Sequence, residues 1–191
     1  MKQVALALML GIVAAGCGGK KDSTDVPPAT GTSTAAPPAK AAAAELATAA
    51  EPAGITWKAT EQPFGSVELP TGDGWEMVEG QLEGKDGTVV MLQSQDGITP
   101  DQLDDYLASY DEVQRRDAPK YVGKPATKGT VGGAPAARVE GTFDNGTRFV
   151  TRDYLIFTKG KVVVLSARVP EAGASGLAGV IDHVARSATI K

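Results

Sequence analysis

Hydrophobic and polar positions change their spacing several times between residues 66 and 187, which predicts alternating strands and helices. Six segments alternate apolar and polar residues, or are apolar on both faces, as strands are; they cover 66–69, 75–83, 88–95, 136–143, 148–158 and 161–169. Apolar residues recur at helical spacing in two further segments, 103–113 and 171–187. The pattern therefore predicts an α+β domain with two main helices.

Turn and capping residues separate these segments. Residues 84–87 contain Asp-Gly, a dipeptide typical of hairpin turns. Thr99 and Gln102 have the spacing of a capping box ahead of the first helix. Asn145-Gly146 and Lys159-Gly160 join the last three strands as tight turns, so these strands are expected to be antiparallel. The last two strands are apolar on both faces, which indicates a sheet with both faces covered.

Three local patterns resemble one family. They are Phe64–Pro70 followed by Gly74-Trp75, then Gly132–Ala136 before the last three strands, and Arg186–Ile190 at the end of the chain. Together with the order of elements they resemble the PsbP-like superfamily, which includes bacterial DcrB-type lipoproteins. Ala188 stands where similar members carry an aromatic residue. The resemblance implies an antiparallel sheet between helices, an α/β/α sandwich. It also implies a non-enzymatic module that docks proteins or supports an envelope assembly, with no shared catalytic residues.

The N-terminus has the features of an export signal. Lys2 precedes an apolar run over 4–15, which is too short to span a membrane as a helix. The run ends in Ala-Ala-Gly-Cys at 14–17, which resembles the bacterial lipobox, with Ala14 where that motif usually has Leu. We expect a signal peptide at 1–16 and a lipidated Cys17 whose acyl chains, palmitate among them, anchor the protein to a membrane. The alternative is an ordinary signal peptide with an incidental Cys17.

Residues 17–54 are predicted to be a disordered tether, and residues 55–191 the folded domain. The segment after Cys17 is rich in Ala, Pro and Thr and contains no aromatic residue, whereas all ten aromatic residues lie between Trp57 and Phe157. Gly18 and Gly19 follow the cysteine, and similar lipoproteins of diderm bacteria are passed to the outer membrane. The expected location is therefore the outer membrane facing the periplasm, or the cell surface.

Composition narrows the chemistry further. The net charge of −4 gives no electrostatic reason to bind nucleic acid. A single Cys excludes an intrachain disulfide, and a single His excludes a His–His metal site. The sequence contains no phosphate-binding loop, dinucleotide fingerprint or nucleophile elbow, so we predict no cofactor, no metal and no catalytic residues. His183 lies beside the apolar stripe of the last helix and is expected at the surface.

The two tight turns define a candidate binding face. If Asn145-Gly146 is a two-residue turn, Arg138 lies opposite Asp153 and Glu140 opposite Thr151. The next turn places Ser166 opposite Asp153 and Arg168 opposite Thr151. The predicted face therefore comprises Arg138, Glu140, Thr151, Asp153, Ser166 and Arg168, and continues into apolar residues. It is either a polar-ended groove for a peptide carboxylate or small ligand, or a solvated surface of cross-strand ion pairs.

Three functions follow from these features. The first is a lipid-anchored envelope module that binds a protein partner through the sheet face or its bordering loops. The second is a periplasmic carrier of a small apolar ligand, held in a groove beside Leu155 and Phe157. The third, a hydrolase, is disfavoured by the near absence of His and Cys. A glycosidase-like use of Glu140 and Asp153 is disfavoured because each would have a basic neighbour that lowers the pKa of the carboxyl.

Overall fold

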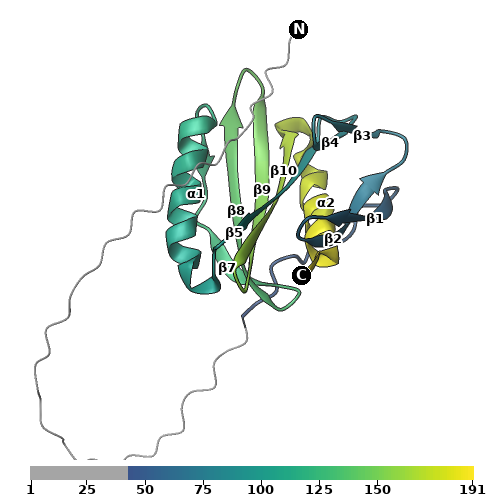
Figure 1. Ribbon diagram of the computed structural model, residues 1–191. Coiled ribbons are helices and arrows are strands. Elements are labelled where there is room, and N and C mark those ends of the chain that lie inside the picture. Colours follow the sequence, from purple (N-terminus) through teal and green to yellow (C-terminus); the bar gives the residue numbers. More distant parts are fainter. Residues whose placement is uncertain (1–42) are drawn as a thin grey trace, which may run out of the picture. The chain divides into compact units, whose positions relative to one another are not determined.

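The computed structural model describes residues 43–191 (Figure 1). The larger sheet has eight strands in the order β3-β4-β5-β10-β9-β8-β6, and β7 also pairs with β8. Its strands are β3 (Trp75–Val78), β4 (Gln81–Gly84), β5 (Val89–Asp96), β6 (Val122–Gly123), β7 (Thr127–Val131), β8 (Ala134–Asp144), β9 (Arg148–Thr158) and β10 (Lys161–Pro170). A smaller sheet, in the order β1-β2-β11, consists of β1 (Thr56–Gln62), β2 (Gly65–Thr71) and β11 (Thr189–Ile190).

Helices cover both faces of the larger sheet. Helix α1 (Leu103–Asp117), preceded by the short 3₁₀ helix η1 (Pro100–Gln102), packs on one face (Figure 1). Helix α2 (Ala174–Ser187), preceded by the 3₁₀ helix η2 (Glu171–Gly173), packs on the other and also contacts β2 of the smaller sheet. This arrangement confirms the predicted α+β class, with an antiparallel sheet flanked by two main helices.

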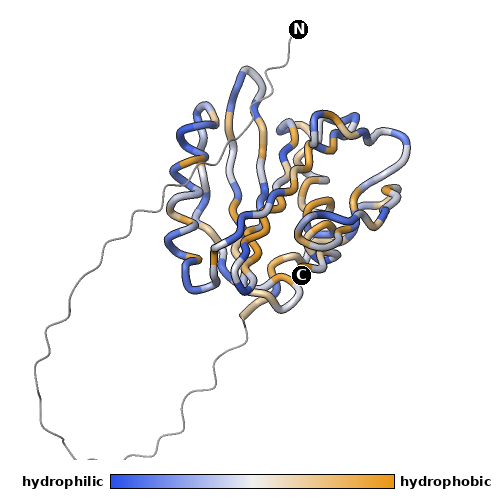
Figure 2. The backbone as a smooth tube through the Cα atoms, in the orientation of Figure 1, coloured by the Kyte–Doolittle hydropathy of each residue, from blue (hydrophilic) through white to orange (hydrophobic). Residues whose placement is uncertain are grey.

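The two helices differ in hydropathy, and they bury different numbers of side chains against the sheet. Figure 2 shows α1 as mostly hydrophilic and α2 as mostly hydrophobic. Only two side chains of α1 are buried, Tyr106 and Tyr110, and the ring of Tyr106 meets Phe157 edge-on at 5.8 Å. Helix α2 buries six residues between the two sheets. The second interface is therefore the main hydrophobic core.

The predicted strand boundaries hold best in the last three strands, and the earlier part of the chain differs. The segment predicted as one strand over 75–83 is a hairpin that turns at Glu79 and Gly80, both with positive φ. Strand β1 was not predicted, nor were β6 and β7, which lie between the first predicted helix and the strand predicted over 136–143. These strands are short or polar, and their pairing with β2 and β8 determines their conformation.

The predicted register of β8 on β9 is wrong by one residue. Arg138 lies opposite Tyr154 and Glu140 opposite Arg152, while Asp153 lies opposite Val139. A one-residue slip moves every side chain of a strand to the other face of the sheet. Arg138 and Glu140 are therefore on the α2 face, whereas the other four predicted residues share the α1 face. The predicted pairing of β9 with β10 is confirmed, with Asp153 opposite Ser166 and Thr151 opposite Arg168.

The physical reason for the slip lies in the turn. Residues 145–147 form a three-residue loop in which the Asp144 carboxylate accepts the Gly146 N–H at 2.9 Å, with Gly146 at a φ of 103°. The extra residue sets Phe143 opposite Phe149, and the two rings stack at 5.0 Å. It also brings Val139 to the same face as Leu155 and Phe157, so the apolar cluster under α1 is continuous.

The folded domain begins earlier than predicted. The boundary at residue 55 is corrected, because residues 44–52 lie along the domain as an extended strap. Glu45 forms a parallel bridge with Thr130 of β7, and Leu46 and Ala47 are buried in the main core. Alanine-rich composition suggested a tether here, but one leucine and backbone hydrogen bonds hold the segment. Cys17 and residues 1–42 lie outside the described part of the chain.

No helix within residues 43–191 is long and apolar enough to cross a membrane.

The corrected register makes a prediction about coupling between side chains. A double-mutant cycle on Glu140→Gln and Arg152→Gln should give a coupling of about 0.5–3 kcal/mol, because these side chains form an ion pair at 2.6 Å. Charge reversal at Arg138 and Asp153 should give none, because the sheet separates them. Urea unfolding of each single and double variant measures both couplings. Strong coupling between Arg138 and Asp153 would contradict this register and favour the one with a two-residue turn.

Candidate functional site

A buried carboxyl lies beneath α1. Asp153 of β9 is 4% exposed and accepts a hydrogen bond from the Tyr110 hydroxyl at 3.0 Å. Burial raises the pKa of Asp153 to about 7, although hydrogen bonds from Tyr110 and Ser166 oppose the shift. The basic neighbour expected for this group, Arg138, lies on the other face of the sheet. The expectation of a lowered pKa is therefore wrong for Asp153.

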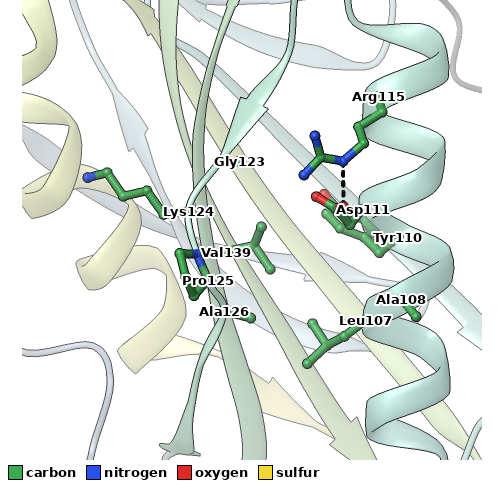
Figure 3. Close-up of a pocket in the computed structure, with 10 residues that line it drawn as sticks. All are labelled: Leu107, Ala108, Tyr110, Asp111, Arg115, Gly123, Lys124, Pro125, Ala126 and Val139. Carbon is green, nitrogen blue, oxygen red and sulfur yellow. Dashed lines mark hydrogen bonds and ion pairs between the residues drawn. The ribbon is translucent and has the colours of Figure 1, made fainter.

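An open cleft of about 370 Å³, lined in part by Tyr110, the partner of this carboxyl, lies between α1 and the connection from β6 to β7 (Figure 3). Val139 of β8 forms part of its wall. Lys124 contributes backbone, and its side chain points away from the helix toward Glu140, at 3.5 Å. The lining is mostly apolar, and consists of Leu107, Ala108, Tyr110, Asp111, Arg115, Gly123, Lys124, Pro125, Ala126 and Val139.

Two polar side chains, Tyr121 and Asp111, lie close to Gly123 in the wall of this cleft. The Tyr121 hydroxyl is buried and has no hydrogen-bond partner among residues 43–191. Burial raises the pKa of Tyr121 to about 12, so the phenol is neutral and able to donate. A β-carbon at Gly123 would stand 3.1 Å from both this hydroxyl and the Asp111 carboxylate. Asp111 is engaged by Arg115 at 2.6 Å, as Figure 3 shows.

On the opposite face, Asp182 of α2 is the centre of a buried polar network. Its side chain is 1% exposed, and Oδ1 lies 3.0 Å from Nη1 of Arg152 and 2.7 Å from the Tyr154 hydroxyl. Its other oxygen, Oδ2, accepts the backbone N–H of Ala49 in the strap at 2.8 Å. Arg152 also pairs with Glu140 at 2.6 Å. A buried charge is tolerated only with such partners, because an unpaired carboxylate would remain desolvated.

Glu140 illustrates how this network controls ionisation. Burial alone would raise the pKa of Glu140, but Arg152, Lys124 and Arg138 together hold the pKa below its ordinary value. The sequence expectation of a basic neighbour is correct for Glu140. Because Glu140 and Asp153 lie on opposite faces of the sheet, the two carboxyls cannot act on one substrate as a catalytic pair.

The same face binds the strap through the strap's backbone. The carbonyl of Leu46 lies 3.1 Å from both the Arg138 guanidinium and the Tyr154 hydroxyl. Arg186 donates to the carbonyls of Ala47 and Ala49 at 3.0 and 2.8 Å. Ordering the strap costs about 1–2 kcal/mol of conformational entropy per residue, while burying one leucine side chain stabilises the fold by about 1.5–3 kcal/mol. The polar contacts to the backbone are therefore needed to keep the strap in place.

His183 lies at the end of the strap and was wrongly expected at the surface. Its side chain is 14% exposed and stacks on the Trp57 ring at a centroid distance of 3.8 Å. Its ring nitrogens lie 2.8 Å from Glu68 and 3.2 Å from Glu51 of the strap. Helical geometry placed His183 correctly on the flank of α2, but β1 and the strap cover that flank.

The structure thus divides the six predicted residues between two clusters. Asp153 and Ser166 belong to the α1 side, where Thr151 bonds the Gly141 carbonyl at 3.4 Å. Arg168 shares that face and reaches Gln81 at 3.2 Å, while burial lowers the pKa of its guanidinium. Arg138 and Glu140 belong to the strap side. Sequence reasoning missed Tyr110 and Asp182, although an aspartate within the apolar stripe of the last helix was a visible signal.

Residues 43–191 contain no group of three or more His, Cys, Asp or Glu side chains arranged to hold a metal ion.

Comparison with known proteins gives structural likeness only. A scan of protein-family models found no match, and a search of curated proteins found no significant relative. Among solved structures, one match is LpqN of Mycobacterium tuberculosis, which is involved in cell envelope biogenesis; it is 16% identical, covering 72% of this chain and 92% of LpqN, with a TM-score of 0.47.

Two further structures match over a similar span. PA94 of Pseudomonas aeruginosa, a protein of unknown function, is 11% identical over 72% of this chain and 97% of its own, with a TM-score of 0.47. PsbP from the cyanobacterium Synechocystis is 11% identical over 71% of this chain and 93% of its own, with a TM-score of 0.49. The last belongs to the family that the sequence resembles. Because all three TM-scores lie below 0.5, these likenesses establish no function for this chain.

The raised pKa of Asp153 predicts how stability depends on pH. Between its ordinary pKa of 3.8 and about 7, the folded protein holds a proton that the unfolded chain has lost. The free energy of unfolding should therefore fall as the pH rises through this window. Asp153→Asn should flatten the fall and make the domain more stable at pH 8, by about 1–4 kcal/mol.

Urea unfolding between pH 4 and pH 8 measures this dependence. The exposed Asp105→Asn is the matched control and should leave the profile unchanged. An Asp153→Asn profile that follows the native one would contradict a buried, poorly compensated carboxyl.

Proposed function

We propose that this chain is a lipid-anchored cell-envelope protein whose folded domain is a non-catalytic module for binding a protein partner. The anchor is Cys17, at the end of the export signal. The binding surface is the cleft between α1 and residues 123–126. In this proposal the protein lies at the outer membrane facing the periplasm, or at the cell surface, and the tether gives the domain its reach.

The observation that carries the binding role is the cleft itself. It is open and mostly apolar, and a buried phenol with no hydrogen-bond partner within residues 43–191, that of Tyr121, lies next to Gly123 in its wall. An open, mostly apolar hollow favours docking of a partner's side chain over a solvated surface.

A small apolar ligand is the second candidate for the same cleft. Its volume of about 370 Å³ lies within the range of small-molecule sites. The groove predicted beside Leu155 and Phe157 does not exist, because α1 covers both residues completely. A carrier would use the cleft near Ala126 instead.

Photo-crosslinking in living cells tests the proposal. A photoreactive phenylalanine analogue at Ala126 should give one dominant protein adduct, identified by mass spectrometry. The same analogue at Ala59, an exposed alanine of β1, is the matched control and should not give this adduct. Absence of a protein adduct from Ala126, with a co-purifying apolar molecule, would shift the assignment to the ligand carrier.

A separate measurement in the same cells, membrane fractionation, tests the lipid anchor. Cys17→Ser should move the protein from the membrane fraction to the soluble fraction, because acyl attachment supplies the membrane affinity. Unchanged membrane association of Cys17→Ser would contradict the lipid anchor while leaving the crosslinking result intact.

A further inference from the structure

The strap of residues 44–52 lies in a site with the features of a peptide receptor. Leu46 donates its N–H to the Thr130 carbonyl at 2.9 Å, and Thr130 donates to the Ala44 carbonyl at 2.9 Å. The strap therefore joins β7 through one parallel bridge, between Glu45 and Thr130. Addition of an extended segment to a strand is a common mode of peptide recognition, in which backbone bonds supply affinity and side-chain pockets supply specificity.

The polar side chains of the domain that surround the strap form hydrogen bonds mainly with the strap's backbone. Arg138 and Tyr154 meet the Leu46 carbonyl, Arg186 meets two further carbonyls, and Asp182 accepts the Ala49 N–H. Any peptide that presents an extended backbone offers these same groups. Recognition of this kind does not depend on the strap's own sequence, except where a side chain enters the core.

Only two side chains of the strap, a leucine and the alanine after it, enter the hydrophobic core. Leu46 and Ala47 are buried, while Thr48, Ala50 and Glu51 are exposed. The site therefore selects one large aliphatic side chain followed by one small one. The large side chain joins the main core between β7 and α2.

Two glycines leave room for a backbone to pass. A β-carbon at Gly129 would collide with the Ala44 carbonyl oxygen and stand 2.8 Å from the Leu46 side chain. A β-carbon at Gly179 of α2 would stand 2.7 Å from the Ala50 carbonyl oxygen. Gly129 lies in a strand, where glycine weakens the local structure, and a close backbone approach is the usual reason for one.

We propose that this cradle, formed by β7, α2 and the polar side chains of β8 and β9, is a peptide-binding site. The strap is its resident occupant, and an extended segment of a partner protein, with one leucine followed by a small residue, takes the same place. The strap is held at few buried positions, so it belongs to the part of the domain that opens locally. The site is distinct from the cleft near α1, and its existence does not depend on the function of that cleft.

A partner's peptide fits the structure better than the strap of a second copy. Pro52 packs beside Gly179, and β1 begins at Thr56. Three residues lie between them, so the four Cα-to-Cα steps from Pro52 to Thr56 reach at most about 14 Å. A strap that entered another copy would have to carry β1 with it, whereas a separate peptide has no such constraint.

The test uses the full chain with Leu46→Asp, which should release the strap and leave the cradle vacant. The probe is a fluorescent peptide with the sequence of residues 43–52. It should bind Leu46→Asp at least about ten-fold more tightly than the native chain, where the attached strap competes at high effective concentration. Thr48→Asp, at an exposed strap position, is the matched control and should behave as the native chain does. Circular dichroism and urea unfolding confirm that each variant is folded.

Specificity for the cradle is measured with two further changes. A probe with Asp in place of leucine should bind at least about ten-fold more weakly. Adding Gly129→Leu to the Leu46→Asp chain should abolish binding, because its side chain fills the space of the strap backbone.

Three outcomes would overturn the proposal. They are a folded Leu46→Asp chain that does not bind the probe, binding that survives Gly129→Leu, and a native chain that dimerises through its straps and excludes the probe. The last result would make the second copy the occupant. None of these outcomes bears on crosslinking from Ala126, so failure of this site and failure of the cleft remain distinguishable.

Discussion

The buried carboxylate of Asp182 is the constraint on which the α2 side of the domain depends. It has almost no contact with solvent, and its partners come from two separate parts of the chain: Arg152 and Tyr154 of β9, and the Ala49 amide of the strap. Removing one partner of a buried pair leaves an uncompensated charge, at a cost of about 3–5 kcal/mol. The carboxylate therefore fixes α2, the central sheet and the strap in one arrangement, and the domain begins at residue 44 because of it.

Buried carboxyl groups have different kinds of partner on the two faces of the sheet. On the α2 side, opposite charges and backbone amides neutralise one another, so Glu140 stays ionised with a lowered pKa. On the α1 side, Asp153 has only hydroxyl partners, and its pKa rises to about 7. The first arrangement holds a segment of the chain in place. The second leaves a poorly compensated carboxyl beside an open cleft, which is where binding is proposed.

Local sequence signals predicted the elements whose structure is determined locally. The spacing of Tyr106 and Tyr110 predicted α1, and the Lys159-Gly160 turn gave the correct register of β9 on β10. The register of β8 could not be predicted, because the turn has three residues and not two. The Asp144 carboxylate accepts the Gly146 N–H in this longer turn, and the extra residue places each β8 side chain on the face opposite to the predicted one. That slip divided the candidate site. The strap was missed because its alanine-rich sequence has no periodicity, and it is ordered by tertiary contacts, among them those to Asp182 and Arg186.

Hydrogen exchange at the strap amides tests the central role of Asp182 most directly. In the native chain the amides of Leu46 and Ala49 are bonded to Thr130 and Asp182 and should exchange more slowly than an unbonded amide. In Asp182→Asn their protection should fall at least about ten-fold, while the amides of α1, on the other face, keep theirs. Unchanged protection in the strap, or an equal loss throughout the domain, would contradict the account of Asp182 as the link between strap, sheet and helix.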